Sequence, residues 1–232
     1  MKYKNLFIDL DDTLWDTSNN NKECLKEIYA DYPFHQHYPS FETFFDNYMP
    51  NNLQLWAQYR KGEINKETLI IGRFLKVLEP LGITDKEYIL SLNKDFLKRT
   101  TLKTKVLPGT FELLEYLRPS FRMFILSNGF REVQALKLRN AGLEPYFSKM
   151  ILSEDACSQK PNKKIFDYAL INTNSKRTET LMIGDCWEAD IVGAKNANID
   201  QIWLNLYDEK VPENEEPPTY MVHSLKEIES IL

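Results

Sequence analysis

Short apolar runs alternate with amphipathic stretches through the second half of the chain. The runs are rich in Phe, Ile and Leu, as buried parallel strands are, and the stretches repeat apolar positions every three or four residues, as helices do. The pattern predicts strands at residues 4–9, 121–127, 149–152, 180–184 and 201–204, with a weaker one at 220–222. Helices are predicted at residues 110–117, 130–141, 163–172 and 188–196. This alternation is typical of an α/β fold with a doubly wound parallel sheet.

Residues 16–105 interrupt the alternation, because helical periodicity dominates there and no convincing strand appears. The predicted helices cover residues 19–31, 41–60, 66–78 and 85–98, and Pro33, Pro39, Gly62, Pro80 and Gly82 separate them. We therefore expect two domains: a core of residues 1–15 and 106–232, and an inserted four-helix cap of residues 16–105.

Composition limits the binding partners and the cellular compartment that we expect for this protein. The 232 residues are 43% hydrophobic and 27% charged, as in a globular protein, and the net charge of −5 argues against binding a nucleic-acid polymer. Cys24, Cys157 and Cys186 lie far apart without a Cys-x-x-Cys pair, so neither a disulfide framework nor a zinc site is indicated. No apolar run is long enough for a signal peptide or a membrane span. We expect a soluble, cytoplasmic protein.

Three acids crowd the end of the first predicted strand: Asp9, Asp11 and Asp12. Ligands of parallel sheets bind beyond the carboxyl ends of the strands. Each close pair of like charges costs about 4 kcal/mol at an effective dielectric constant near 20, and a cation such as Mg²⁺ relieves that repulsion. A solvated acidic turn is the alternative. An EF-hand loop is excluded because Leu14 stands where that loop needs glycine.

Three further segments carry candidate chemistry. Ser127 and Asn128 lie where a strand ends before a helix, a place that suits phosphate, although a serine there is more often a helix cap. Lys160 precedes Pro161 and a helix. A single lysine in such a place is usually solvated rather than part of a site. Asp185 ends another strand, and Asp190 follows on the next helix. These acids could complete a metal site, or they could be a helix N-cap and a solvated surface acid.

Together these segments resemble the haloacid dehalogenase superfamily. An apolar strand with Asp-x-Asp-x-Thr, a serine at a strand end, a lysine before a helix and Gly-Asp-x-x-x-x-Asp occur here in that order. The resemblance covers nearly the whole chain and implies a Rossmann-like core with a helical cap of the type inserted directly after the first motif.

The resemblance also implies a mechanism. Asp9 would attack phosphorus to form an aspartyl-phosphate, and Asp11 would protonate the leaving oxygen and then activate water. Mg²⁺, with Mn²⁺ or Co²⁺ as substitutes, would be held by Asp9, the backbone carbonyl of Asp11 and Asp185, with Asp190 behind them. Ser127, Asn128 and Lys160 would bind the phosphate, and Lys160 would keep Asp9 ionised. The acid at position 11 argues against dehalogenation, since the dehalogenases proper lack it.

A closer resemblance, to the YjjG-type pyrimidine 5′-nucleotidases, rests on several strings. They are Leu55-Trp-x-x-Tyr59, Gly72-Arg-Phe74, Ser127-Asn-Gly-Phe130, the segment 160–170 and Trp203-Leu-Asn205. This subfamily hydrolyses nucleoside monophosphates such as UMP, dUMP and dTMP. Candidates to contact a base are Trp56, Tyr59, Arg60, Arg73 and Phe130, although aromatics at helical spacing are more often cap core.

Three other functions stay open. One is a broad sugar-phosphate phosphatase of the same fold; the second is a phosphomutase, whose cap motif we do not find. The third is a phosphate-sensing module like the response receivers, whose acceptor aspartate follows the third strand rather than the first. For any of the enzymes we expect a small phosphate ester as substrate and a monomer or homodimer.

Overall fold

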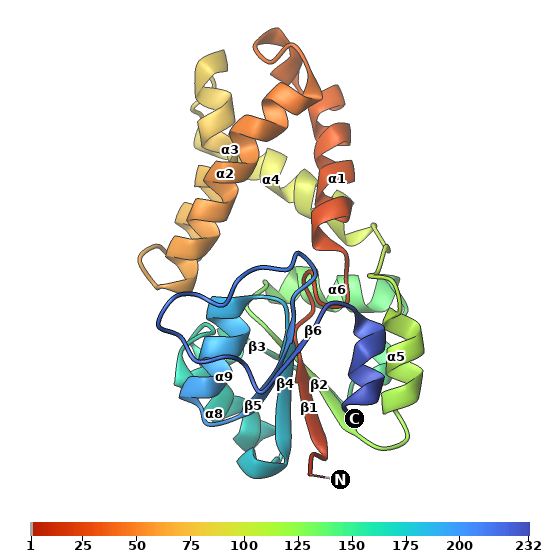
Figure 1. Ribbon diagram of the computed structural model, residues 1–232. Coiled ribbons are helices and arrows are strands. Elements are labelled where there is room, and N and C mark those ends of the chain that lie inside the picture. The colour runs from red at the N-terminus through yellow and green to blue at the C-terminus, as the bar shows by residue number, and fades with distance from the viewer. Residues whose placement is uncertain (1) are drawn as a thin grey trace. The chain divides into compact units, whose positions relative to one another are not determined.

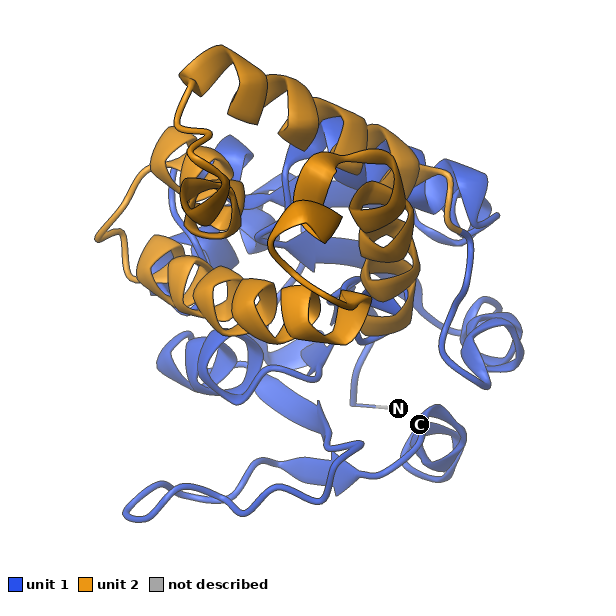
Figure 2. Ribbon diagram, turned by 90° about the horizontal axis from the view of Figure 1, so that it is seen from above, with its two compact units in different colours: residues 1–17, 104–232 blue, residues 18–103 orange. Residues whose placement is uncertain are grey.

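The computed structural model describes residues 2–232, which form two compact units: residues 2–17 with 104–232, and residues 18–103 (Figure 2). Within these residues no helix is both long enough and apolar enough to cross a membrane. The three cysteines are free.

A parallel sheet organises the first unit. In the described residues its strands are β1 (Asn5–Ile8), β2 (Arg122–Ser127), β3 (Lys149–Leu152), β4 (Thr180–Gly184), β5 (Asp200–Leu204) and β6 (Tyr220–Val222). Their order is β3-β2-β1-β4-β5-β6, and every neighbouring pair is parallel. The predicted α/β fold is confirmed, and the strand order reverses direction between β1 and β4, which is where such sheets bind ligands.

Helices cover both faces of this sheet (Figure 1). Leu6 and Ile8 of β1 pack in one apolar cluster with α5 (Thr110–Leu117) and α6 (Arg131–Asn140). Phe7, which points to the other face, packs with α8 (Lys163–Asn172) and α9 (Gly193–Asn196). A short helix, α7 (Ser153–Ala156), follows β3. Because both faces are covered, β1 is buried along its whole length, which suits the apolar run of residues 6–8.

The predicted helix at residues 188–196 is only partly present. Residues Trp187–Val192 form a π-helical segment instead, and α9 is confined to four residues. The wider turn leaves Asp190 buried and bonded to the backbone N–H of Cys186 at 3.1 Å. Periodicity alone could not reveal this, because a π-helical segment is wound differently from the α-helix whose period the sequence pattern follows.

The second unit is helical. It contains α1 (Thr17–Asp31), α2 (Phe41–Arg60), α3 (Lys66–Leu78) and α4 (Lys86–Thr101) around a core of aromatic and aliphatic side chains. Ser40, Asn65 and Asp85 begin three of these helices, and each accepts a hydrogen bond from the backbone N–H three residues later.

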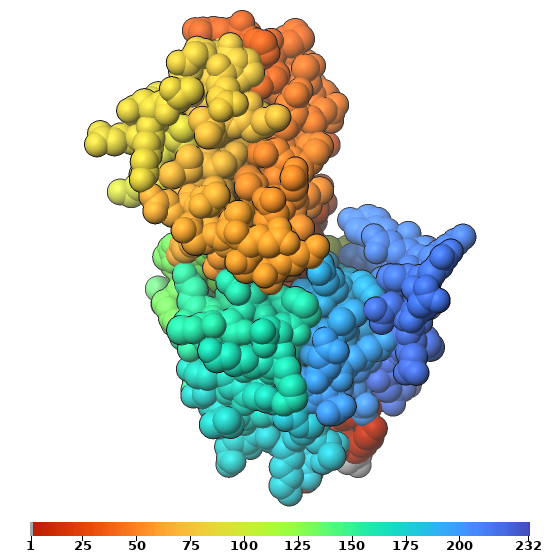
Figure 3. Space-filling model, turned by 90° about the vertical axis from the view of Figure 1, so that its left-hand side faces the viewer, coloured from red at the N-terminus to blue at the C-terminus, as the bar shows by residue number. Residues whose placement is uncertain are grey.

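The acidic and Pro-rich segment between β5 and β6 is a surface loop of the first unit. It extends away from the sheet in two views, and most of its residues from Leu206 to Pro217 are exposed (Figures 2 and 3).

Candidate active site

Asp9 follows β1 and is held between two neighbouring strand ends. Its backbone N–H donates to Ile183 of β4 at 2.9 Å, and its Oδ1 accepts from Lys160 Nζ at 2.6 Å. Burial raises the pKa of Asp9 to about 7; Lys160 opposes that rise, and the nearby acids Asp190 and Asp11 add to it. Lys160 thus favours the ionised form of Asp9, but burial outweighs its effect on the pKa. That Lys160 keeps Asp9 ionised stays a prediction.

Lys160 is fully engaged by the protein. Besides Asp9, its ammonium donates to Asp190 Oδ1 at 2.6 Å and to the backbone carbonyl of Leu126 at 2.7 Å. An ammonium has three hydrogens, so all are used. Burial alone would lower its pKa, but Asp190 and Asp9 raise the pKa of Lys160 above its ordinary value. A phosphate oxygen can therefore bind Lys160 only by replacing one of these acceptors.

Asp185 completes an acidic cluster at the end of β4. Carboxylate oxygens of Asp9, Asp185 and Asp190 lie within 4.8 Å of one another. Thr13 joins the first and fourth strand ends, because its hydroxyl donates to Asp185 Oδ1 at 2.8 Å and accepts from the backbone N–H of Asp185 at 3.1 Å. Burial and the charges of Asp9 and Asp190 raise the pKa of Asp185.

This cluster suits a hard divalent cation. Its donors are all oxygens, and three acids at such short separation repel one another unless protons or a cation neutralise them. Asp190 has the least freedom to join as a ligand, because Lys160 and Cys186 already bind its two oxygens. Asp9 and Asp185 are the acids that remain accessible to an ion.

Asp11 is turned toward a different set of partners. Its Oδ1 accepts from Thr17 Oγ1 at 2.8 Å and from Lys137 Nζ at 2.5 Å, and its Oδ2 accepts from Gln134 Nε2 at 2.6 Å. Burial would raise the pKa of Asp11, but Lys137, Thr17 and Gln134 together hold it below its usual value. The structure therefore separates two neighbouring acids electrostatically: Asp9 shares its lysine with Asp190, whereas Asp11 is paired with Lys137.

Ser127 and Asn128 occupy the end of β2. Ser127 Oγ accepts from the backbone N–H of Gly129 at 3.0 Å and from Gln134 at 2.7 Å. The side chain of Asn128 makes a reciprocal pair with the backbone of Lys160, at 2.9 Å and 2.8 Å. Asn128 thereby orients the lysine loop, and a contact of its side chain with substrate stays a prediction.

Four residues of this site were missed by sequence reasoning: Thr13, Thr17, Gln134 and Lys137. Thr13 stands within the first motif, but its contact with Asp185 spans 172 positions and no local pattern signals it. Gln134 and Lys137 are three apart on α6 and therefore share a helix face. Both are buried on that helix beside Val133 and Leu138, and a polar pair on an apolar face was the signal available.

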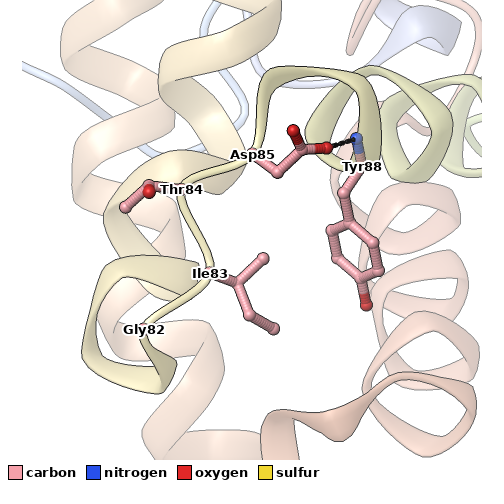
Figure 4. A pocket seen from close by; sticks show the side chains of 5 residues that line it. All are labelled: Gly82, Ile83, Thr84, Asp85 and Tyr88. Atoms are coloured by element: carbon pink, nitrogen blue, oxygen red, sulfur yellow. Dashed lines mark hydrogen bonds between the residues drawn. The ribbon is translucent and has the colours of Figure 1, made fainter.

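A shallow hollow in the second unit is a weaker candidate. Gly82, Ile83, Thr84, Asp85 and Tyr88 line it, and Asp85 is its one acid (Figure 4). That acid already accepts from the backbone N–H of Tyr88 at 2.7 Å as the cap of α4, so its carboxylate has a structural role.

Comparison with known proteins gives consistent matches over the length of the chain. Residues 6–204 match the model of the haloacid dehalogenase-like hydrolases. The chain is 35% identical to pyrimidine 5′-nucleotidase YjjG of Escherichia coli (strain K12), covering 100% of this chain and 99% of that protein. It is 29% identical to pyrimidine 5′-nucleotidase PynA of Streptococcus pneumoniae, covering 98% and 94%. The magnesium-bound structure of the putative hydrolase YfnB from Bacillus subtilis has a TM-score of 0.87 at 29% identity and covers 100% and 99%.

Proposed function

The chain belongs to the family of haloacid dehalogenase-like hydrolases, and we propose that it hydrolyses phosphate monoesters with Asp9 as the nucleophile and Mg²⁺ as cofactor. One observation carries the proposal: Asp9 lies at a strand end, 2.6 Å from a buried lysine, with its carboxylate beside those of Asp185 and Asp190. The proposed nucleophile and the proposed cation site would therefore coincide at the edge where a parallel sheet binds its ligand.

The proposed reaction has two steps, in which Asp9 and Asp11 divide the work. First an oxygen of Asp9 attacks phosphorus, the bond from phosphorus to the ester oxygen breaks, and the leaving oxygen takes a proton from Asp11. Because its donors lower the pKa of Asp11 in the free protein, this step requires that Asp11 take up its proton when the substrate binds. Then water attacks the phosphorus of the aspartyl-phosphate and gives a proton to Asp11, and inorganic phosphate leaves Asp9. Asp11 ends each cycle as it began.

The remaining residues of the site bind the cation and the phosphate. We propose that Asp9, the backbone carbonyl of Asp11 and Asp185 hold the cation, with Asp190 behind them, and that Mn²⁺ or Co²⁺ can substitute for Mg²⁺. A divalent cation supplies charge neutralisation for the phosphoryl oxygens. Ser127 and Lys160 bind the phosphate, and Asn128 contributes by fixing the backbone at Lys160.

We propose that residues 18–103 act as the cap of this site. The unit is inserted between β1 and β2, directly after the segment that carries Asp9 and Asp11. It also contains Trp56 and Tyr59, which lie edge to face with ring centroids 5.8 Å apart, and the buried Arg73. These are suitable groups for a heterocyclic base.

The substrate we propose is a pyrimidine nucleoside monophosphate such as UMP, dUMP or dTMP. Two relatives carry the name pyrimidine 5′-nucleotidase and align with at least 98% of this chain. A broad sugar-phosphate phosphatase is the alternative within the same chemistry. We place the enzyme in the cytoplasm, a reducing compartment that suits its three free cysteines. We propose that it is a monomer or a homodimer.

A substrate panel tests the proposal. Release of inorganic phosphate is measured from pyrimidine and purine monophosphates and from sugar phosphates, with Mg²⁺ and with excess chelator. We expect turnover only with the metal and a preference of at least about tenfold in kcat/KM for pyrimidine monophosphates, equivalent to about 1.4 kcal/mol. Equal rates on sugar phosphates would favour the alternative, and absence of any metal-dependent turnover would refute a phosphatase.

A further inference from the structure

A single amide joins the two polar groups at the ends of β1 and β2. Gln134 of α6 is 1% exposed, and its Nε2 donates both to Asp11 Oδ2 at 2.6 Å and to Ser127 Oγ at 2.7 Å. An amide nitrogen has two hydrogens, so both are used. The reversed amide would set its carbonyl oxygen against a carboxylate, and the repulsion between them fixes the orientation.

The contacts of Asp11 leave one acceptor position open. Its two carboxylate oxygens offer about four lone-pair sites. Thr17 and Lys137 take both sites of Oδ1, and Gln134 takes one site of Oδ2. The remaining site is therefore on Oδ2, the oxygen that Gln134 holds.

We propose that Gln134 is a positioning residue for proton transfer: it orients Asp11 so that Oδ2 gives the proton to the leaving oxygen and later takes one from water. This inference rests on the proposed phosphatase reaction. The proton balance is complete, because the oxygen that loses the proton in the first step regains it in the second.

The same amide determines what Ser127 can do. The hydroxyl oxygen of Ser127 accepts from Gly129 and from Gln134, so both of its lone pairs are taken. Its own hydrogen must then be donated elsewhere, and a phosphate oxygen is an acceptor. Gln134 thus orients the Ser127 hydroxyl to donate its hydrogen and orients Asp11 to transfer a proton.

The space around the amide is closed on the side of Gly129. A Cβ atom at Gly129 would lie 2.3 Å from Gln134 Nε2, so Gly129→Ala must displace the amide without replacing any polar residue. Lys137 is held independently, with its Nζ 4.0 Å from the centroid of the Trp15 ring. The amide can therefore be disturbed in two separate ways, by Gln134→Met and by Gly129→Ala.

The test compares two esters that differ in their need for an acid. The alkoxide that leaves UMP needs a proton, whereas nitrophenolate leaves p-nitrophenyl phosphate without one. The value of kcat/KM covers only the steps through departure of the leaving group, so it isolates the acid role of Asp11. We expect Gln134→Met and Gly129→Ala to lower the ratio of kcat/KM for UMP to that for p-nitrophenyl phosphate by at least about tenfold. Any loss through Ser127 affects both esters and cancels in the ratio.

Two controls complete the experiment. Arg139→Met removes a cation from the same helix, where Arg139 is exposed and paired with Glu144, and should leave the ratio unchanged. In an Asp11→Asn background, Gln134→Met should change the ratio no further, because the two residues act as a unit. An unchanged ratio in Gln134→Met, or an equal further loss in the Asp11→Asn background, would overturn the inference. If the parent enzyme hydrolyses neither ester with Mg²⁺, the proposed function itself fails.

Discussion

Asp9, Asp185 and Asp190 lie close together beside Lys160. The charge of each group is compensated only while the others keep their positions. Lys160 binds Asp9 and Asp190 with equal distances of 2.6 Å, so it distributes one positive charge between two carboxylates. Removing either acid would leave the lysine with less compensation, and removing the lysine would leave buried like charges. The geometry of this group therefore matters as much as its composition.

Gly184 is the backbone position on which that geometry depends. A Cβ atom there would lie 2.3 Å from Asp190 Oδ2 and 2.4 Å from Asp190 Cγ. We predict that Gly184→Ala displaces Asp190 from Lys160 and from Cys186, which should cost about 1–3 kcal/mol in the free energy of unfolding. Phosphatase activity should fall as well, because Lys160 loses one of its three acceptors.

Urea denaturation and phosphate release measure the two effects of Gly184→Ala. A variant with the stability and activity of the parent would show that Asp190 can move without consequence, contrary to this account.

At the scale of elements, the alternation of apolar runs and helical periods predicted much of the fold. The predicted bounds of β3, β4, β6, α2 and α8 agree with the structure, since each segment is bounded by Gly, Pro, Asn or polar residues. The π-helical segment before α9 and the short α7 were not predicted. The period of an α-helix does not predict a π-helical segment, and a four-residue helix has no detectable period.

Only the site residues that lie at strand ends or within sequence motifs could be predicted from the sequence. Asp9, Asp185 and Lys160 are brought together by the parallel sheet, as sequence order and topology implied. The partners of Asp11 were not predictable, because Lys137 lies 126 positions away in the chain. A helix face that mixes buried polar and apolar residues gives no local sign of what its polar members contact.

The helices of the second unit contain a buried charge with no acidic partner. Arg73 of α3 is 3% exposed, and its Nε has no hydrogen-bond partner among residues 2–232. The Phe96 ring, with its centroid 5.6 Å away, and the hydroxyl of Tyr48 provide its other contacts. Burial of a guanidinium without a carboxylate is costly, so a role in binding would explain its presence better than a role in stability.

We predict that Arg73→Met leaves the melting temperature unchanged or raises it, while lowering the preference for UMP over p-nitrophenyl phosphate. The matched control is Arg99→Met, because Arg99 of α4 pairs with Asp31 at 2.6 Å and with Asp95 at 2.8 Å. That control should lower the melting temperature and keep the preference. Thermal melts and kcat/KM on both esters measure these outcomes, and a large loss of stability in Arg73→Met would assign Arg73 to the core.

At the scale of the whole molecule, the family match confirms the resemblance inferred from the motifs. Fold alone would not define the reaction, since one fold supports many chemistries. The acid at position 11 and the acidic cluster at the ends of β1 and β4 are what favour phosphate esters. The reaction is therefore assigned by a few side chains on a shared framework.

Metal binding should couple to pH through Asp9. In the metal-free protein burial raises the pKa of this carboxyl to about 7, so near neutral pH a cation must compete with a proton. A carboxyl with a raised pKa favours the metal-free fold most at low pH, and that contribution is lost as pH rises through 7. We predict that Mg²⁺ raises the melting temperature more at pH 8 than at pH 6.

Thermal melts with Mg²⁺ and with chelator, in matched buffers at each pH, measure this linkage. Asp185→Asn is the control, because loss of a cation ligand should reduce the effect of Mg²⁺ at both pH values. A larger stabilisation by Mg²⁺ at pH 6 would contradict the assignment of Asp9 as a ligand.

The central claim is that Asp9 is the nucleophile of a magnesium-dependent phosphatase. The most direct test is the steady-state release of inorganic phosphate from UMP by Asp9→Asn with saturating Mg²⁺, after circular dichroism has shown the parent fold. The account predicts a fall of at least about a thousandfold in kcat, equivalent to about 4 kcal/mol. Release within about tenfold of the parent rate would contradict it.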